Sequence, residues 1–149
     1  SRLASSVAIS SYHKETDPSF SNTMHTLHVD GIVHDELMSI IEKYGPSKID
    51  EVINHENDYN FDYFAWRSLQ EMYLLKTPEG KVIERPQHMY MRVALWVTNT
   101  YEEAIEYYNS LSNQRISKAT PIMINSGTKI SPSFGAKSKI TGFKSLTNP

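Results

Sequence analysis

The chain has 149 residues, 39% of them hydrophobic, which is enough for one domain with an apolar core. Its formal net charge of −2 gives no reason to expect a nucleic acid or an anionic membrane as partner. Cysteine is absent, which excludes disulfides, thiolate metal sites and thiol catalysis by this chain, and the lack of a signal peptide or a long apolar run favours a cytoplasmic protein.

The first third of the chain carries the patterns of three helices. A rough apolar face predicts a helix over residues 1–13. Asp17 followed by Pro18 can cap and begin a second helix, and the chain is expected to turn at Asp30-Gly31. Apolar residues at positions 37, 40, 41 and 44 then predict an amphipathic helix that ends at Gly45-Pro46.

Shorter elements are expected between residues 47 and 83. Ser47 and Asp50 can cap one short helix, and Asn60 can cap another. The turn sequence Thr77-Pro-Glu-Gly80 lies between two apolar pairs, at 74–75 and 82–83, and predicts a small β-hairpin. The core-facing side of the helix after Asn60 is predicted to be formed by Phe61, Phe64 or Ala65, Ser68 or Leu69, and Met72.

The helical pattern is strongest after Glu84. Pro86 suits the first turn of a helix, where its missing N–H would have no partner. Apolar residues recur from there at helical spacing as far as Trp96, which is expected to be buried against the next helix. That next helix begins with a capping box formed by Thr100 and Glu103.

The last patterned stretch is the apolar run Ile122-Met123-Ile124. It lies between Pro121 and the turn-forming Asn125-Ser-Gly127, and it predicts a buried β-strand. Beyond this run the composition changes, because residues 129–149 contain four lysines and no acidic residue. This divergent basic tail is predicted to be weakly ordered or foreign to the fold.

A series of motifs in unbroken order resembles the large, catalytic (alpha) subunit of class I ribonucleotide reductase. The resemblance covers roughly positions 2 to 128, and a long string of separate matches is more specific than any one motif. The matching segments are Leu3-Ala with Ala8-Ile-Ser, His13-Lys-Glu-Thr16, Asn60-Phe-Asp-Tyr-Phe64, Leu69, Tyr73-Leu-Leu75, Glu84-Arg-Pro-Gln-His-Met89, Met91-Arg-Val93, Ala119-Thr-Pro121 and Asn125-Ser-Gly-Thr128.

The resemblance implies a mainly α fold with three parts. Residues 1–114 would be the helical N-terminal region, with one small hairpin, and residues 115–128 the first strand of a ten-stranded α/β barrel. Residues 129–149 would be the divergent tail. The family's regulatory nucleotide-binding region would precede this chain and much of its catalytic site would follow, so the chain resembles a fragment.

The implied function is part of ribonucleoside-diphosphate reductase. The partners implied are a ribonucleoside diphosphate substrate, the remaining reductase chains, a radical-generating small subunit and a thiol reductant. In the family, a reducing cysteine follows this strand. Counted without gaps, that cysteine falls near Ala136 and the serine before it near Gly135, so neither residue can serve. The chain alone is therefore expected to be inactive, with no catalytic residue, no metal ligand and no cofactor of its own.

Thr120 is the one residue that the resemblance carries toward the substrate. The family places threonine or serine before this proline, where the hydroxyl and backbone meet the nucleotide, and a hydroxyl can donate to a phosphate or ribose oxygen. The alternative is that Thr120 only forms a turn before Pro121.

The remaining polar residues favour structural roles. The six histidines show no convergence of three or four ligands, and His88 is expected to pack or form hydrogen bonds. Arg92 lies on an otherwise apolar helix, so a buried ion pair with Glu84 or Glu103 is favoured over a phosphate site. Charged residues expected on solvated faces are Asp58, Asp62, Glu71 and Lys76.

A second class of function stays open. The chain would then be a catalytically dead, stand-alone helical interaction module from a truncated or split reductase gene. A downstream reading frame that resumes with a Ser-Ser-Cys segment would favour a split or interrupted reductase.

Overall fold

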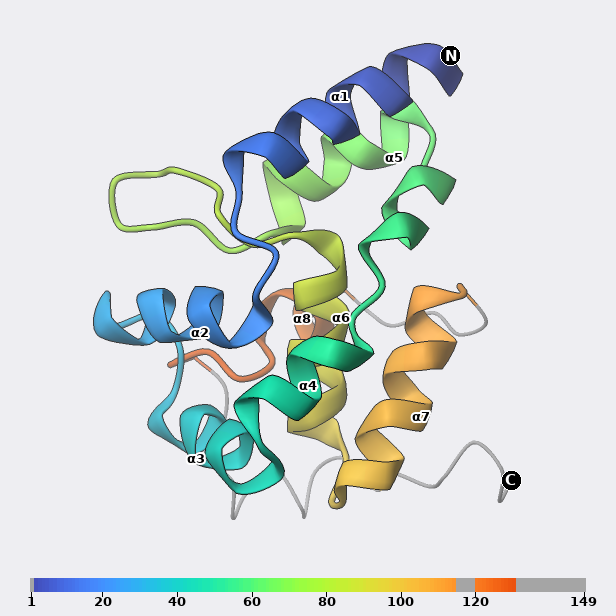
Figure 1. Cartoon of the computed structure of the whole chain (residues 1–149). Coiled ribbons are helices and arrows are strands. Elements are labelled where there is room, and N and C mark those ends of the chain that lie inside the picture. Colours follow the sequence, from blue (N-terminus) through green and yellow to red (C-terminus); the bar gives the residue numbers. More distant parts are fainter. Residues whose placement is uncertain (1, 115–119, 131–149) are drawn as a thin grey trace.

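The computed structural model describes residues 2–114 and 120–130, with the side chains of Thr120 and Pro121 outside the description. The described residues form helices joined by short connections and by one longer loop, residues 74–85, between η2 and α6 (Figure 1). The elements are α1 Arg2–Glu15, α2 Phe20–Val29, α3 Asp35–Tyr44, α4 Pro46–Val52, the 3₁₀ helix η1 His55–Asn60, α5 Tyr63–Ser68, the π-helix η2 Leu69–Tyr73, α6 Pro86–Val97, α7 Tyr101–Ser112 and α8 Thr120–Asn125.

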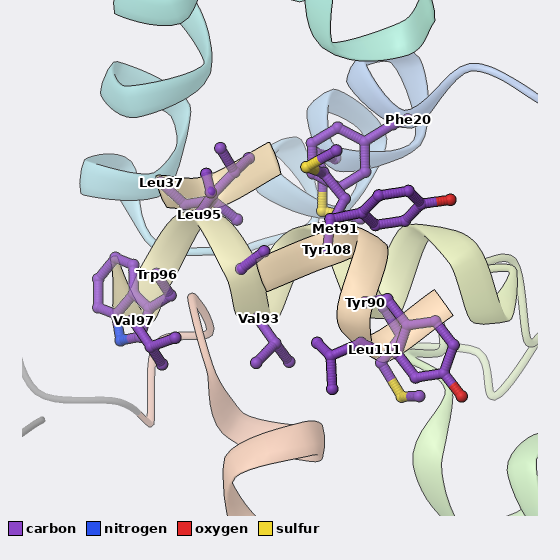
Figure 2. Close-up of a cluster of buried hydrophobic side chains, with 14 of the residues drawn as sticks. Phe20, Leu37, Tyr90, Met91, Val93, Leu95, Trp96, Val97, Tyr108 and Leu111 are labelled. Atoms are coloured by element: carbon purple, nitrogen blue, oxygen red, sulfur yellow. The ribbon is translucent and has the colours of Figure 1, made fainter. Parts of the chain in front are cut away.

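Helix α6 is the centre of the molecule. All twelve of its residues are buried, and α7, α3, α8 and η1 pack against it (Figure 1). Pro86 begins the helix at the position where a missing N–H costs nothing. Figure 2 shows the apolar side chains of α6, among them Val93, Leu95 and Trp96, within the main core. Trp96 is 4% exposed, so its predicted burial is confirmed, and its ring lies 5.7 Å from that of His34, the residue that caps α3. Its predicted packing against α7 stays a prediction.

A second, smaller core lies where α1 packs against α5. It consists of Ile9, Tyr12 and Trp66, with the Tyr12 and Trp66 rings edge to face at 5.5 Å. The predicted inner face of this region is partly wrong, because Phe64 is 81% and Met72 59% exposed. The cap of α5 is Asp62 rather than Asn60, because the Asp62 carboxylate accepts a hydrogen bond from the Ala65 N–H.

Other predicted helix boundaries are confirmed or corrected by the backbone. Helix α3 ends at Tyr44 as expected, and Gly45 follows with φ +105°, a conformation that favours glycine. Pro46 then begins α4, so Ser47 and Asp50 lie inside that helix instead of capping it. Asp50 instead binds the start of α2, whose N-cap is Ser19, since its carboxylate accepts hydrogen bonds from the Ser19 hydroxyl and the Ser21 N–H.

No strand is assigned within residues 2–114 and 120–130. The turn of the predicted hairpin is present, with the Gly80 N–H donating to the Thr77 carbonyl, and one isolated antiparallel bridge, Lys76 to Val82, flanks it. The predicted hairpin strands are therefore not confirmed. The strand predicted at Ile122–Ile124 is wrong, since these residues belong to α8. The physical reason is that a short apolar run does not distinguish strand from helix, and a helix satisfies its backbone groups without a neighbouring strand. The rest of the predicted strand segment, residues 115–119, and the tail from residue 131 lie outside the described residues.

Candidate functional site

The best-defined polar site is a buried ion pair between the segment before α6 and α6 itself. Arg92 Nε donates to Glu84 Oε2 at 2.7 Å, and Arg92 Nη2 donates to Glu84 Oε1 at 2.9 Å. Both side chains are 0% exposed. The Leu75 N–H also donates to Glu84 Oε1, and the Tyr12 hydroxyl donates to the Glu84 carbonyl. The predicted buried pair is therefore confirmed with Glu84 as partner, and Glu103 instead accepts from the Asn99 N–H.

The other side of the Arg92 guanidinium binds the C-terminal end of α8. Nη1 donates to the carbonyls of Ile124 at 3.0 Å and Ser126 at 2.8 Å. These carbonyls lie at and just beyond the helix C-terminus, where backbone acceptors lack partners inside the helix and a positive charge is favourable. Arg92 thus joins α6 to α8 through both its charge and its hydrogen bonds.

The turn that follows α8 is attached to the start of α3. The His34 N–H donates to the Gly127 carbonyl at 2.8 Å, and the Lys129 N–H donates to the Ile32 carbonyl at 3.0 Å. Gly127 has φ +75°, and a Cβ added there would lie 2.9 Å from Leu37 Cδ2. Both the conformation and the close approach favour glycine at this position.

Thr120, the predicted substrate residue, is the first residue of α8. The backbone of Thr120 therefore lies at the opposite end of this short helix from the Ile124 and Ser126 carbonyls, which accept hydrogen bonds from Arg92. The position of its hydroxyl lies outside the described part of the chain, so a role in substrate binding stays a prediction. Gly135 and Ala136, the positions matched to the family's serine and cysteine, also lie outside the described residues.

A second polar network joins α1, η1, α6 and α7 through the side chain of Gln87. Its amide Nε2 donates to Asp58 Oδ1 at 2.9 Å, and its Oε1 accepts from the hydroxyls of Tyr108 and Ser112. The other Asp58 oxygen lies 2.7 Å from His13 Nε2. Asp58 is 0% exposed, so its predicted place on a solvated face is wrong. Spacing along the sequence gives no signal for this burial, because the partners lie 29 and 45 residues away.

Arg85 and His88 connect α6 to the segment between α1 and α2. Arg85 donates from Nε to the Thr16 hydroxyl and from Nη2 to the His13 and Thr16 carbonyls. His88 Nδ1 accepts from the Arg85 N–H, so its Nε2 carries the proton and donates to the Pro18 carbonyl at 3.0 Å. Burial lowers the pKa of His88 to about 3, and the ring is therefore neutral. The predicted hydrogen-bonding role of His88 is confirmed.

His55 extends this cluster toward the surface. Its Nε2 donates to the same Pro18 carbonyl at 2.8 Å, and its ring lies 5.0 Å from that of His88, edge to face. Burial also lowers the pKa of His55. Among the described residues, no group of three or more His, Cys, Asp or Glu side chains is placed to hold a metal ion.

The polar side chains of the Glu84–Arg92 stretch thus bind other parts of the same chain. Glu84, Arg85, Gln87, His88 and Arg92 are all buried, and every one has hydrogen-bond partners on other elements or loops. The arrangement orients helices rather than presenting groups to a ligand. Thr120, the residue predicted to meet the substrate, begins α8, and Arg92 binds that helix at its C-terminal end.

Comparison with known proteins gives the family of this chain. Residues 59–131 match the family described as "Ribonucleotide reductase, all-alpha domain". The chain is 40% identical over 136 residues to the ribonucleoside-diphosphate reductase large subunit of Monkeypox virus, with 85% of this chain and 17% of that protein covered. Identity to the large subunit of Vaccinia virus (strain Copenhagen) is 39%, and to that of Caenorhabditis elegans 37%, with the same coverage.

The chain belongs to the ribonucleotide reductase large-subunit family. It spans about 17% of the length of these relatives. Within the described residues, no helix has the length and apolar character needed to cross a membrane.

Proposed function

We propose that this chain supplies the helical framework beside the catalytic barrel of a ribonucleoside-diphosphate reductase large subunit. In the assembled enzyme, Thr120 would form part of the wall of the pocket for a ribonucleoside diphosphate. The observation that carries the proposal has two parts. The polar side chains of residues 84–92 bind other parts of the same chain, and Arg92 binds the C-terminal end of α8. Such a framework contributes to catalysis by positioning, since a small displacement of a substrate contact can cost much of the rate.

The chemistry of reduction is assigned to other parts of the enzyme. The chain contains no cysteine, so it supplies neither a thiyl radical nor a reducing dithiol. A radical-generating small subunit and a thiol reductant are proposed as partners, with the assembly acting in the cytoplasm. The purified chain, mixed with a small subunit and a dithiol, is expected to form no deoxyribonucleotide. Turnover above background in this cysteine-free preparation would contradict the assignment.

A chimeric subunit tests the proposed framework directly. The matched residues of this chain would replace their counterparts in the Vaccinia virus large subunit, and deoxyribonucleotide formation would be measured with the cognate small subunit. We expect a folded and active chimera. A matched pair of variants gives the control: Glu84→Gln should reduce activity, whereas Glu71→Gln, in an exposed pair with Arg67, should leave it unchanged. A folded chimera without activity would contradict the proposal.

A second candidate, an interaction module without catalysis, is favoured by the exposed apolar residues at the end formed by α1 and α5. Leu3 is 75%, Val7 60% and Phe64 81% exposed. A chimera without turnover, together with binding of the isolated chain to a reductase large subunit, would favour this second function.

A further inference from the structure

We infer that Arg92, oriented by Glu84, is a positioning residue that sets where α8 places Thr120 in the pocket for a ribonucleoside diphosphate. The inference rests on the proposed function and adds the residue that controls the geometry of that site. It is carried by the hydrogen bonds that Arg92 makes on its two sides, to the Glu84 carboxylate and to the end of α8.

Stability alone is a poor explanation for this ion pair. Both charges are completely removed from water, and the desolvation cost of such a pair offsets much of its Coulomb attraction. Apolar side chains of similar volume often replace a buried ion pair without loss of stability, although here they would leave the Leu75 N–H and the carbonyls of Ile124 and Ser126 without these partners. An apolar pair would not orient the groups around it. The planar guanidinium does so through several hydrogen-bond donors in a fixed geometry.

All three guanidinium nitrogens of Arg92 donate hydrogen bonds. Nε and Nη2 face the two carboxylate oxygens of Glu84, which fixes the plane of the guanidinium. The Leu75 N–H in turn fixes the carboxylate. With its plane fixed, Nη1 points at the carbonyls of Ile124 and Ser126 and defines where α8 ends.

The end of α8 is close enough to Thr120 for this position to be transmitted. An α-helix rises about 1.5 Å per residue, so the backbone of Thr120 lies about 6 Å along the axis from that of Ile124. The turn after α8 is also attached to α3 through Gly127 and Lys129. A change at Arg92 or Gly127 would therefore shift α8 from two different sides.

Hydrogen exchange on the complete chain tests the local part of the inference. In Arg92→Lys, the amides of Ser126, Thr128 and Lys129 should exchange about tenfold faster, while those of α7 keep their protection. Lysine retains the charge but not the fork geometry. Gly127→Ala is the second variant, because its Cβ would lie 2.9 Å from Leu37 Cδ2 and 3.4 Å from Arg92 Cγ while the guanidinium keeps all its donors. Unchanged exchange at these amides in both variants would overturn the inference.

A double-mutant cycle in the chimeric subunit tests the functional part. Arg92→Lys and Thr120→Val should each raise the Kd of a ribonucleoside diphosphate by about tenfold, and the double variant should be no weaker than either single one. Arg67→Lys, at an exposed ion pair, is the control and should leave the Kd unchanged. A purely structural role for Arg92 would instead give additive effects.

The outcomes separate the inference from the function on which it rests. Additive effects in a chimera that binds substrate and turns over would overturn only the role of Arg92. A parent chimera that binds no ribonucleoside diphosphate would overturn both. Non-additive effects together with faster local exchange would support both.

Discussion

Helix α6 and the α5–η2 segment carry similar numbers of aromatic and long apolar side chains, yet the fold treats them differently. Every residue of α6 is buried, whereas α5 and η2 bury Trp66 and Leu69 and leave Phe64 and Met72 exposed. The difference lies in what surrounds them. Helix α6 is contacted by α3, α7, α8 and η1, whereas α1 packs against α5 and α8 packs against η2.

This comparison explains where charge is found in the two regions. A helix covered on all sides must pair every polar group it carries, and α6 does so with Gln87, His88 and Arg92. A helix covered on one side can leave its charges in water, as Arg67 and Glu71 show at 53% and 58% side-chain exposure. Four predictions test this contrast.

Loss of the buried aromatic ring should have the largest effect. Trp66→Ala is expected to lower the free energy of unfolding by about 3–5 kcal/mol, because the ring is 1% exposed and fills the smaller core. Phe64→Ala, two residues away and 81% exposed, should change it by less than about 0.5 kcal/mol. Denaturant unfolding measures both. Equal losses would mean that the assigned faces of α5 are wrong.

Breaking the buried ion pair should cost slightly less. Glu84→Gln leaves the Arg92 charge buried without a counter-charge, and we expect a loss of about 3 kcal/mol in the free energy of unfolding. The matched Glu71→Gln change removes the exposed pair on α5–η2 and should give no resolvable shift. Similar midpoints for Glu84→Gln and the parent would contradict the burial of this pair.

Acid should destabilise the α6 region through His88. The pKa of His88 is about 3 in the folded chain and has its ordinary value of 6.5 in the unfolded chain. At a pH between these values, the unfolded chain binds a proton that the folded chain does not bind. Stability is therefore fully present above pH 6.5 and falls by about 1.4 kcal/mol per pH unit below it. His88→Gln should reduce the slope of stability against pH by this amount. Denaturant unfolding at a series of pH values measures this slope, and an unchanged slope in His88→Gln would contradict the burial of a neutral ring.

The smallest effect concerns the start of α5. Asp62→Ala removes the carboxylate that accepts from the Ala65 N–H at 2.7 Å, and a lost cap costs about 1 kcal/mol. Asn60→Ala should have little effect, since Asn60 lies in η1 and does not cap α5. Thermal unfolding of the two variants compares them. A larger loss for Asn60→Ala would restore the boundary predicted from sequence.

The sequence by itself determined the features that depend on near neighbours along the chain. The end of α3 at Gly45, the start of α6 at Pro86 and the cap of α7 at Thr100 follow from backbone conformations and side-chain acceptors within one helical turn. The choice between Glu84 and Glu103 for Arg92 stayed open, because both lie within reach along the sequence. The family motifs identified the large subunit, but they did not show that the motif's polar residues are buried.

Only the tertiary structure decided which residues meet across the chain. Asp58 is buried because Gln87 and His13 come to it from other helices, and Trp66 replaces Phe64 in the core because α1 packs on that side. The run at 122–124 is helical because it satisfies its backbone locally and its end is bound by Arg92 and followed by a turn attached at His34. These outcomes depend on contacts between residues that lie 29, 45 or more positions apart in the sequence. Local propensity does not encode such contacts.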